Sequence, residues 1–173
     1  MGSEKTLTKK QNIGSIGDMK SQTTVLILAL CFFGAALSFA DDSLMGTWKL
    51  NETKSKFTAE ANKNHTVVYE TVGENVKITV DGKDKDGKST HNEWSGKFDG
   101  KDYAVTGDPT SDTRSYKKVN DHTLAMTVKK DGKVTSTGQV VVSADGKSRV
   151  VSTSGTDSGG KKVSNKVVYD KQQ

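Results

Sequence analysis

Residues 123–133 read TLAMTVKKDGK, and this stretch contains the two features that decide the fold. Leu124, Met126 and Val128 alternate with Ala and Thr, and this period of two indicates a β-strand with one buried and one wet face. The Asp-Gly pair at 131–132 follows, and Asp-Gly readily adopts the positive φ angles that a tight hairpin turn requires. The stretch therefore predicts a strand that ends in a hairpin.

The same pattern recurs along the chain after residue 40. Val76, Ile78 and Val80 alternate with polar residues, and we find no sustained helical period. Asp-Gly pairs, each followed by Lys, predict turns at 81–82, 86–87, 99–100, 131–132 and 145–146. The expected strands are 45–51, 65–72, 75–81, 88–98, 102–106, 113–119, 123–130, 133–143, 147–154 and 162–170.

Many short antiparallel strands avoid exposed edges either by closing into a barrel or by pairing face to face. We therefore predict an all-β fold, an antiparallel up-and-down β-barrel of about 8–10 strands. A β-sandwich is the alternative.

The first 40 residues differ in character from the rest of the chain. Lys20 precedes an uncharged, largely apolar stretch at 25–37, and Ser38-Phe39-Ala40 forms a small-x-small cleavage site. These features are typical of a secretory signal peptide, and the apolar stretch is shorter than the about 20 residues that span a bilayer. We expect residues 1–18 to be a misassigned or disordered extension, 19–40 the signal peptide, cleaved after Ala40, and 41–173 a single barrel domain. The expected location is the periplasm or outside the cell, with no membrane association after cleavage.

The composition of residues 41–173 narrows the classes of partner. The 22 basic and 19 acidic residues of this segment are interleaved, which predicts a solvated surface and no nucleic-acid partner. The segment has no Cys, so disulfides cannot stabilise it. Only 36 of its residues are apolar and 17 of these are Val, which predicts a lean core built from strands.

Five aromatic residues are the candidate ligand-binding set of a barrel lumen. They are Tyr69, Trp94, Phe98, Tyr103 and Tyr116. A closed barrel of this size holds one small ligand if its inward side chains leave room. The other role open to these rings is to form the core itself. Residues 135–139 and 152–154 are polar on both faces, which suits a wet lumen, a polar ligand or a strand exposed to a partner.

The two ends of the domain carry a family resemblance. Residues 44–50, LMGTWKL, resemble the first strand of the lipocalin and fatty-acid-binding protein superfamily, and 167–171, VVYDK, resemble the closing strand of its fatty-acid-binding branch. The resemblance implies a lipocalin-like barrel in which Gly46 and Trp48 are structural and the indole plugs the closed end. Two departures matter. Only about 14 residues separate the first two strands, with no helical pattern, and Val167 stands where that branch has its carboxylate-binding Arg.

Motifs for catalysis or metal binding are incomplete. Residues 82–93 resemble a calcium loop but have Gly82 where the first carboxylate should be. His65, His91 and His122 are isolated and have no metal-ligand spacing. We expect no catalytic residues, no metal, no cofactor and no enzymatic activity. The first functional hypothesis is an exported lipocalin-like domain that binds a small apolar or amphipathic molecule. The alternative is a cell-envelope structural or protein-interaction module without a small-molecule ligand.

Overall fold

The computed structural model describes residues 43–58, 61–156 and 159–173. The predicted extension at 1–18 and signal peptide at 19–40 lie outside these residues. The strands of the described chain are β1 (Gly46–Lys56), β2 (Lys63–Val72), β3 (Asn75–Lys83), β4 (Ser89–Gly96), β5 (Tyr103–Thr106), β6 (Thr113–Asn120), β7 (Thr123–Lys130), β8 (Lys133–Val142), β9 (Ser148–Thr156) and β10 (Lys162–Lys171).

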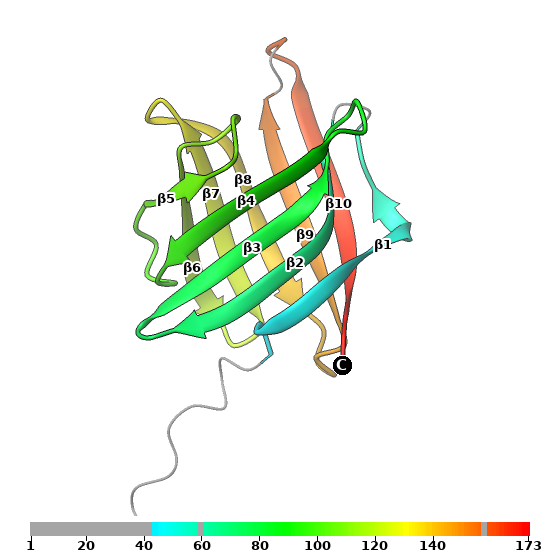
Figure 1. Ribbon diagram of the computed structural model, residues 1–173, viewed down its shortest axis with the longest axis vertical. Coiled ribbons are helices and arrows are strands. Elements are labelled where there is room, and N and C mark those ends of the chain that lie inside the picture. Colours follow the sequence, from blue (N-terminus) through cyan, green and yellow to red (C-terminus); the bar gives the residue numbers. More distant parts are fainter. Residues whose placement is uncertain (1–42, 59–60, 157–158) are drawn as a thin grey trace, which may run out of the picture. The chain divides into compact units, whose positions relative to one another are not determined.

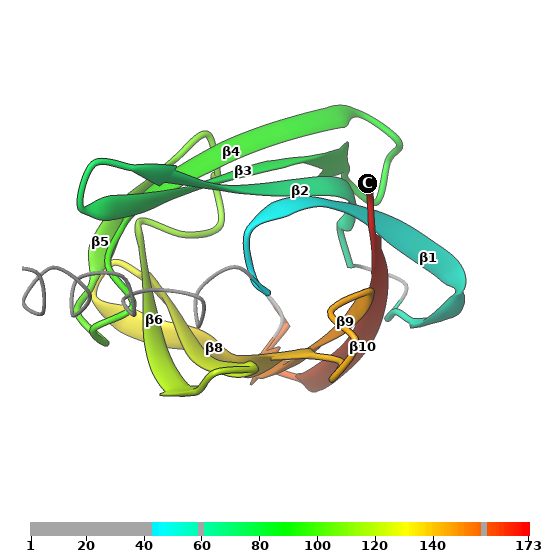
Figure 2. The same cartoon turned by 90° about the horizontal axis from the view of Figure 1, so that it is seen from below.

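The ten strands form one closed, antiparallel, up-and-down barrel (Figure 1). Each strand pairs with its neighbour in sequence, and β1 pairs with β10 to close the ring, with Trp48 opposite Lys171. The predicted fold class is therefore confirmed, and the barrel replaces the sandwich alternative. Seen from its end, the ring is flattened, with β2, β3 and β4 along one wall and β6, β8, β9 and β10 along the other (Figure 2).

The Asp-Gly pairs form turns at four of the five predicted places. Gly87, Gly100, Gly132 and Gly146 all have positive φ angles between +69° and +83°. The turn predicted at Asp81-Gly82 is wrong, because both residues lie inside β3 and the chain reverses after Asp84 instead. Gly82 is needed there for another reason. A Cβ atom at this position would lie 2.4 Å from the carbonyl oxygen of Lys63, where the pairing of β2 and β3 shifts register.

Inward-facing residues fill the barrel according to the period of two. Val76, Ile78 and Val80 on β3 are all buried, and so is Trp94, which pairs with Ile78 from β4. The buried core continues through β2, β7 and β8 to Tyr169 on β10. This apolar lining does not fill the interior completely, and the space that remains is the candidate site.

Candidate functional site

A cavity of about 380 Å³ lies inside the barrel. Its apolar lining comes from opposite walls, including Val67 on β2, Ile78 on β3 and Val151 on β9. Asn62 and Thr110 also line it and are exposed, so the cavity reaches solvent where the β1–β2 connection and the β5–β6 loop lie. The volume falls within the range of about 300–1,000 Å³ that is typical of small-molecule sites.

Polar residues line part of the cavity on the later strands. Ser136 on β8, Thr153 on β9 and Asn165 on β10 are among its lining residues. Ser136 and Thr153 belong to the segments whose polar character on both faces suggested a wet lumen. The cavity therefore has apolar walls with a polar strip, which suits an amphipathic occupant better than a purely apolar one.

Arg149 lies against the ring of Trp48 inside the barrel. Both side chains are almost fully buried, with 1% of Arg149 and none of Trp48 exposed. The guanidinium carbon lies 4.7 Å from the ring centre of Trp48, 4.7 Å from that of Tyr69 and 4.9 Å from that of Tyr169. Cation–π attraction to three rings offsets part of the free energy needed to remove this charge from water.

The hydrogen-bonding capacity of Arg149 is largely unused. Its Nε and Nη1 atoms are buried and have no hydrogen-bond partner. Among the described residues, no carboxylate forms an ion pair with this guanidinium. A buried donor without a partner normally costs about 1–3 kcal/mol, and more when it is charged. Arg149 is also a lining residue of the cavity, although Nε and Nη1 themselves have almost no accessible surface.

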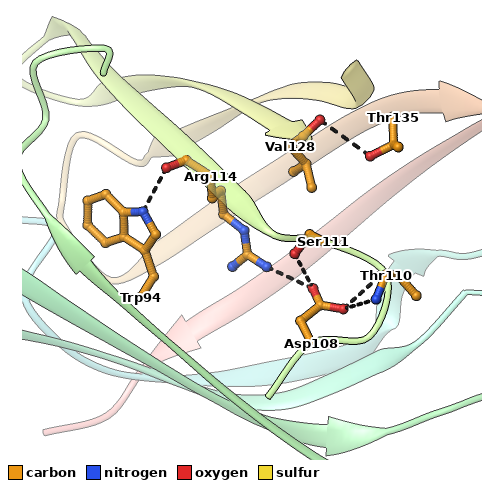
Figure 3. Close-up of polar contacts among 7 residues, drawn as sticks. All are labelled: Trp94, Asp108, Thr110, Ser111, Arg114, Val128 and Thr135. Atoms are coloured by element: carbon orange, nitrogen blue, oxygen red, sulfur yellow. Dashed lines mark hydrogen bonds and ion pairs between the residues drawn. The ribbon is translucent and has the colours of Figure 1, made fainter. Parts of the chain in front are cut away.

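Arg114 is the second cation of the cavity wall, and its Nε is also buried without a hydrogen-bond partner, but its guanidinium pairs with a carboxylate. Its Nη2 atom lies 3.2 Å from Oδ2 of Asp108, and the two side chains are only 12% and 13% exposed. Asp108 accepts further hydrogen bonds from the hydroxyl groups of Thr110 and Ser111, both at 2.7 Å (Figure 3). Burial alone would raise the pKa of Asp108, but the hydrogen bonds from Thr110 and Ser111, together with the charge of Arg114, lower it. Asp108 is therefore ionised at neutral pH and neutralises Arg114.

Two tyrosines around Arg149 keep their protons over a wide range of pH. Burial raises the pKa of Tyr69 and of Tyr169 to about 12, although the positive charge of Arg149 acts in the opposite direction. Both phenols line the cavity as neutral hydroxyl groups at physiological pH. They are therefore available as hydrogen-bond donors.

The five predicted aromatic residues divide into two groups. Tyr69 and Tyr116 line the cavity. Trp94, Phe98 and Tyr103 are not among its described lining residues, since they pack into a cluster around Trp94. The ring centres of Trp94 and Tyr116 are 4.9 Å apart, so Tyr116 joins this cluster to the cavity. The ligand-binding role of the set stays a prediction.

The two residues of the Gly-x-Trp motif lie at the start of β1, and their role as the plug of the barrel stays a prediction. Gly46 has a φ of +99°, which residues with a side chain rarely adopt. Trp48 is fully buried, and its indole N–H donates a 2.9 Å hydrogen bond to the carbonyl oxygen of Leu44.

The charged residues of the cavity were missed by the sequence analysis. They are Asp108, Arg114 and Arg149. One signal pointed to two of them: the chain has 26 Lys and Arg residues, of which only positions 114 and 149 are Arg. Arg149 also shares the inward face of β9 with Val151 and Thr153, two residues apart along a strand.

No group of three or more potential metal ligands occurs within the described ranges. Nor does this part of the chain contain a helix of the length and apolarity that would cross a membrane. No protein-family model matches the chain, and a search of curated proteins finds no significant match. The closed ten-stranded antiparallel barrel is consistent with a lipocalin-like fold.

Proposed function

We propose that the barrel is a lipocalin-like carrier or sensor that binds one small amphipathic molecule in its central cavity. The observation that carries the proposal is the cavity of about 380 Å³, with apolar walls, a polar strip and buried arginines. A module that needed only stability would gain from filling this space, because empty volume in a core lowers stability. The proposal is one of binding, without catalysis.

The decisive experiment measures binding of 1-aminoanthracene, a small neutral fluorescent dye, to the purified domain. We expect saturable binding of one dye per chain. Val151→Phe should abolish it, because Val151 lines the cavity and the larger ring would occupy the dye's space. Val141→Phe is the matched control, since Val141 lies on the adjacent strand β8 and is 41% exposed.

Overpacking costs about 1–3 kcal/mol, so the folding of both variants is checked by circular dichroism. Equal dye binding by Val151→Phe and the parent would place the dye outside the barrel. A complete lack of saturable binding, for this dye and for a panel of lipids, pigments and small aromatic compounds, would favour the envelope module instead.

We also propose that the domain acts in the periplasm or outside the cell after removal of residues 19–40. The charged start, the apolar stretch and the Ser38-Phe39-Ala40 site support this. The first residue of the exported protein should be Asp41 or lie within a residue or two of it, as read by N-terminal sequencing. A membrane-bound product that retains residues 19–40 would contradict export by cleavage.

A further inference from the structure

We infer that the cavity selects a monoanion: an amphipathic molecule whose single acidic group, a carboxylate or a sulfate ester, binds against Arg149. This inference rests on the proposed function and specifies the chemical class of the ligand. Two nitrogen atoms of the Arg149 side chain have no hydrogen-bond partner within the protein.

The guanidinium of Arg149 has unused donors in a place where water is largely excluded. Its exposed fraction is 1%, and Nε and Nη1 have no partner. Three aromatic rings surround the cation, and Tyr69 also forms a side-chain hydrogen bond with it, but no carboxylate among the described residues pairs with it. Planar guanidinium donors match the two oxygens of an acidic group, and such charge-assisted hydrogen bonds are about twice as strong as neutral ones.

The charge of the ligand follows from the charges in the cavity wall. The charged residues among the described lining residues are Asp108, Arg114 and Arg149. Asp108 pairs with Arg114 at 3.2 Å, so this pair is neutral as a whole. Arg149 is then the uncompensated cation, and one negative charge balances it. A dianion would bring a second charge into a wall that has no further free cation among these residues.

The apolar and tyrosine residues of the cavity wall indicate the properties of the rest of the ligand. Val67, Ile78 and Val151 give the same cavity apolar walls, and these favour an alkyl or ring portion of the ligand. Tyr69 and Tyr169 lie against the guanidinium and retain their hydroxyl protons, so they can donate to the same acidic group. The ligand class is therefore a small amphiphile with one acidic end.

The test compares ligands of one chain length that differ only in the head group. Octanoate, octyl sulfate, octyl phosphate and octan-1-ol are titrated into the purified domain by calorimetry at pH 7.5 and in 0.5 M NaCl. At that pH the carboxylate and the sulfate carry one charge, whereas the phosphate carries nearly two. We expect octanoate or octyl sulfate to bind at least tenfold more tightly than octan-1-ol, and octyl phosphate to bind more weakly than octyl sulfate.

High salt separates Arg149 from the many surface lysines. Attraction to exposed charges is largely screened at this ionic strength, whereas a buried contact is screened much less. The tenfold preference for the monoanion should therefore persist in 0.5 M NaCl. Its loss in salt would assign the preference to surface lysines and overturn the inference.

Two variants test the residue itself. Arg149→Met should bind octanoate and octan-1-ol with affinities within about twofold of each other. Lys147→Met is the matched control, because it removes an exposed positive charge two residues away and should keep the full preference. If Arg149→Met does not fold, Arg149→Lys replaces it, and we expect the preference to fall at least threefold because Lys lacks the planar pair of donors.

The outcomes separate this inference from the proposed function. If the parent domain binds octan-1-ol as tightly as both octanoate and octyl sulfate, the monoanion is overturned while a ligand-binding barrel remains. A preference that survives in folded Arg149→Met would overturn the role of Arg149. Binding of neither the octyl series nor 1-aminoanthracene would reject the proposed function, and the inference would fall with it.

Discussion

Trp48 and Trp94 have nearly identical burial but different surroundings. Trp48 is 0% and Trp94 is 1% exposed, and each indole N–H donates to a backbone carbonyl, that of Leu44 at 2.9 Å and that of Arg114 at 2.8 Å. The ring of Trp94 packs against three other aromatic rings. The ring of Trp48 packs against the guanidinium of Arg149.

Under our proposal, the difference separates a region that serves stability from one that serves a ligand. Around Trp94, the ring contacts and the indole hydrogen bond are satisfied within the protein. Nε of the neighbouring Arg114 is buried without a partner, but its Nη2 atom pairs with Asp108. Around Trp48, two guanidinium nitrogen atoms are buried and unsatisfied. Replacing buried charges by apolar residues is often neutral or stabilising, so stability alone does not explain an arginine at position 149. Arg149, which has no carboxylate partner among the described residues, also borders the cavity.

The largest effect on stability is expected when either indole ring is removed. Trp48→Ala and Trp94→Ala should each lower the free energy of unfolding by about 3–5 kcal/mol, as removal of buried aromatic side chains does. Trp94→Ala should have the larger effect, because each of its three aromatic pairs contributes about 0.5–1.5 kcal/mol beyond burial. Urea denaturation followed by circular dichroism gives both values. A value below about 1 kcal/mol for Trp48→Ala would refute its role as the plug of the barrel.

The fold was predictable because its signal is local. Alternation at 76–80 and at 123–128 reports which face of a strand is buried, and Asp-Gly pairs report where the chain reverses. The one misplaced turn, at Asp81-Gly82, shows the limit of this reasoning. Gly82 is required by the close approach of the Lys63 carbonyl from β2, and a contact between strands cannot be recognised in the dipeptide itself.

The site was less predictable because it depends on contacts between distant strands. An aromatic residue that faces inward lines a lumen or packs into a core, and the alternation alone does not distinguish the two. Trp94 packs with Phe98 and Tyr103, whereas Tyr69 borders the cavity. The arginines were recognisable only as rare residues in a lysine-rich chain, and their partners come from other strands and loops.

An intermediate effect is expected when the pH is raised around the Trp48 region. Burial raises the pKa of Tyr69 and Tyr169 to about 12, against about 10 in an unfolded chain. The folded state thus favours the protonated phenols, and this contribution is fully present below pH 10 and is lost as the pH rises from 10 to 12. The loss amounts to up to about 3 kcal/mol for each residue.

Phenolate absorbance during an alkaline titration measures this effect. Two of the four tyrosines should ionise only near pH 12 or together with unfolding. Tyr69→Phe should remove one of these two late ionisations. If Tyr69 and Tyr169 ionise near pH 10 while the domain stays folded, their phenols are open to water.

The smallest effect on stability is expected from substitution of Arg149, the cation that we assign to the ligand. Substitution of Asp108, the acid that pairs with Arg114, provides the contrast. Asp108→Ala removes the partner of Arg114 and three further hydrogen-bond contacts. Removing one partner of a buried ion pair costs about 3–5 kcal/mol, and we expect about 2–3 kcal/mol here because Asp108 lies in a loop and is 13% exposed.

Arg149→Met should change the free energy of unfolding by less than about 1 kcal/mol, or raise it. The variant loses cation–π contacts of about 2 kcal/mol in all, but it also removes a buried charge with two unsatisfied donors, and methionine fills a similar volume. Urea denaturation of both variants without ligand gives the comparison. A loss at Arg149→Met as large as that at Asp108→Ala would mean that the guanidinium is a structural element of the closed end. A small decrease, or an increase, in the free energy of unfolding would mean that Arg149 does not serve stability. This is expected of a side chain whose partner is a bound ligand.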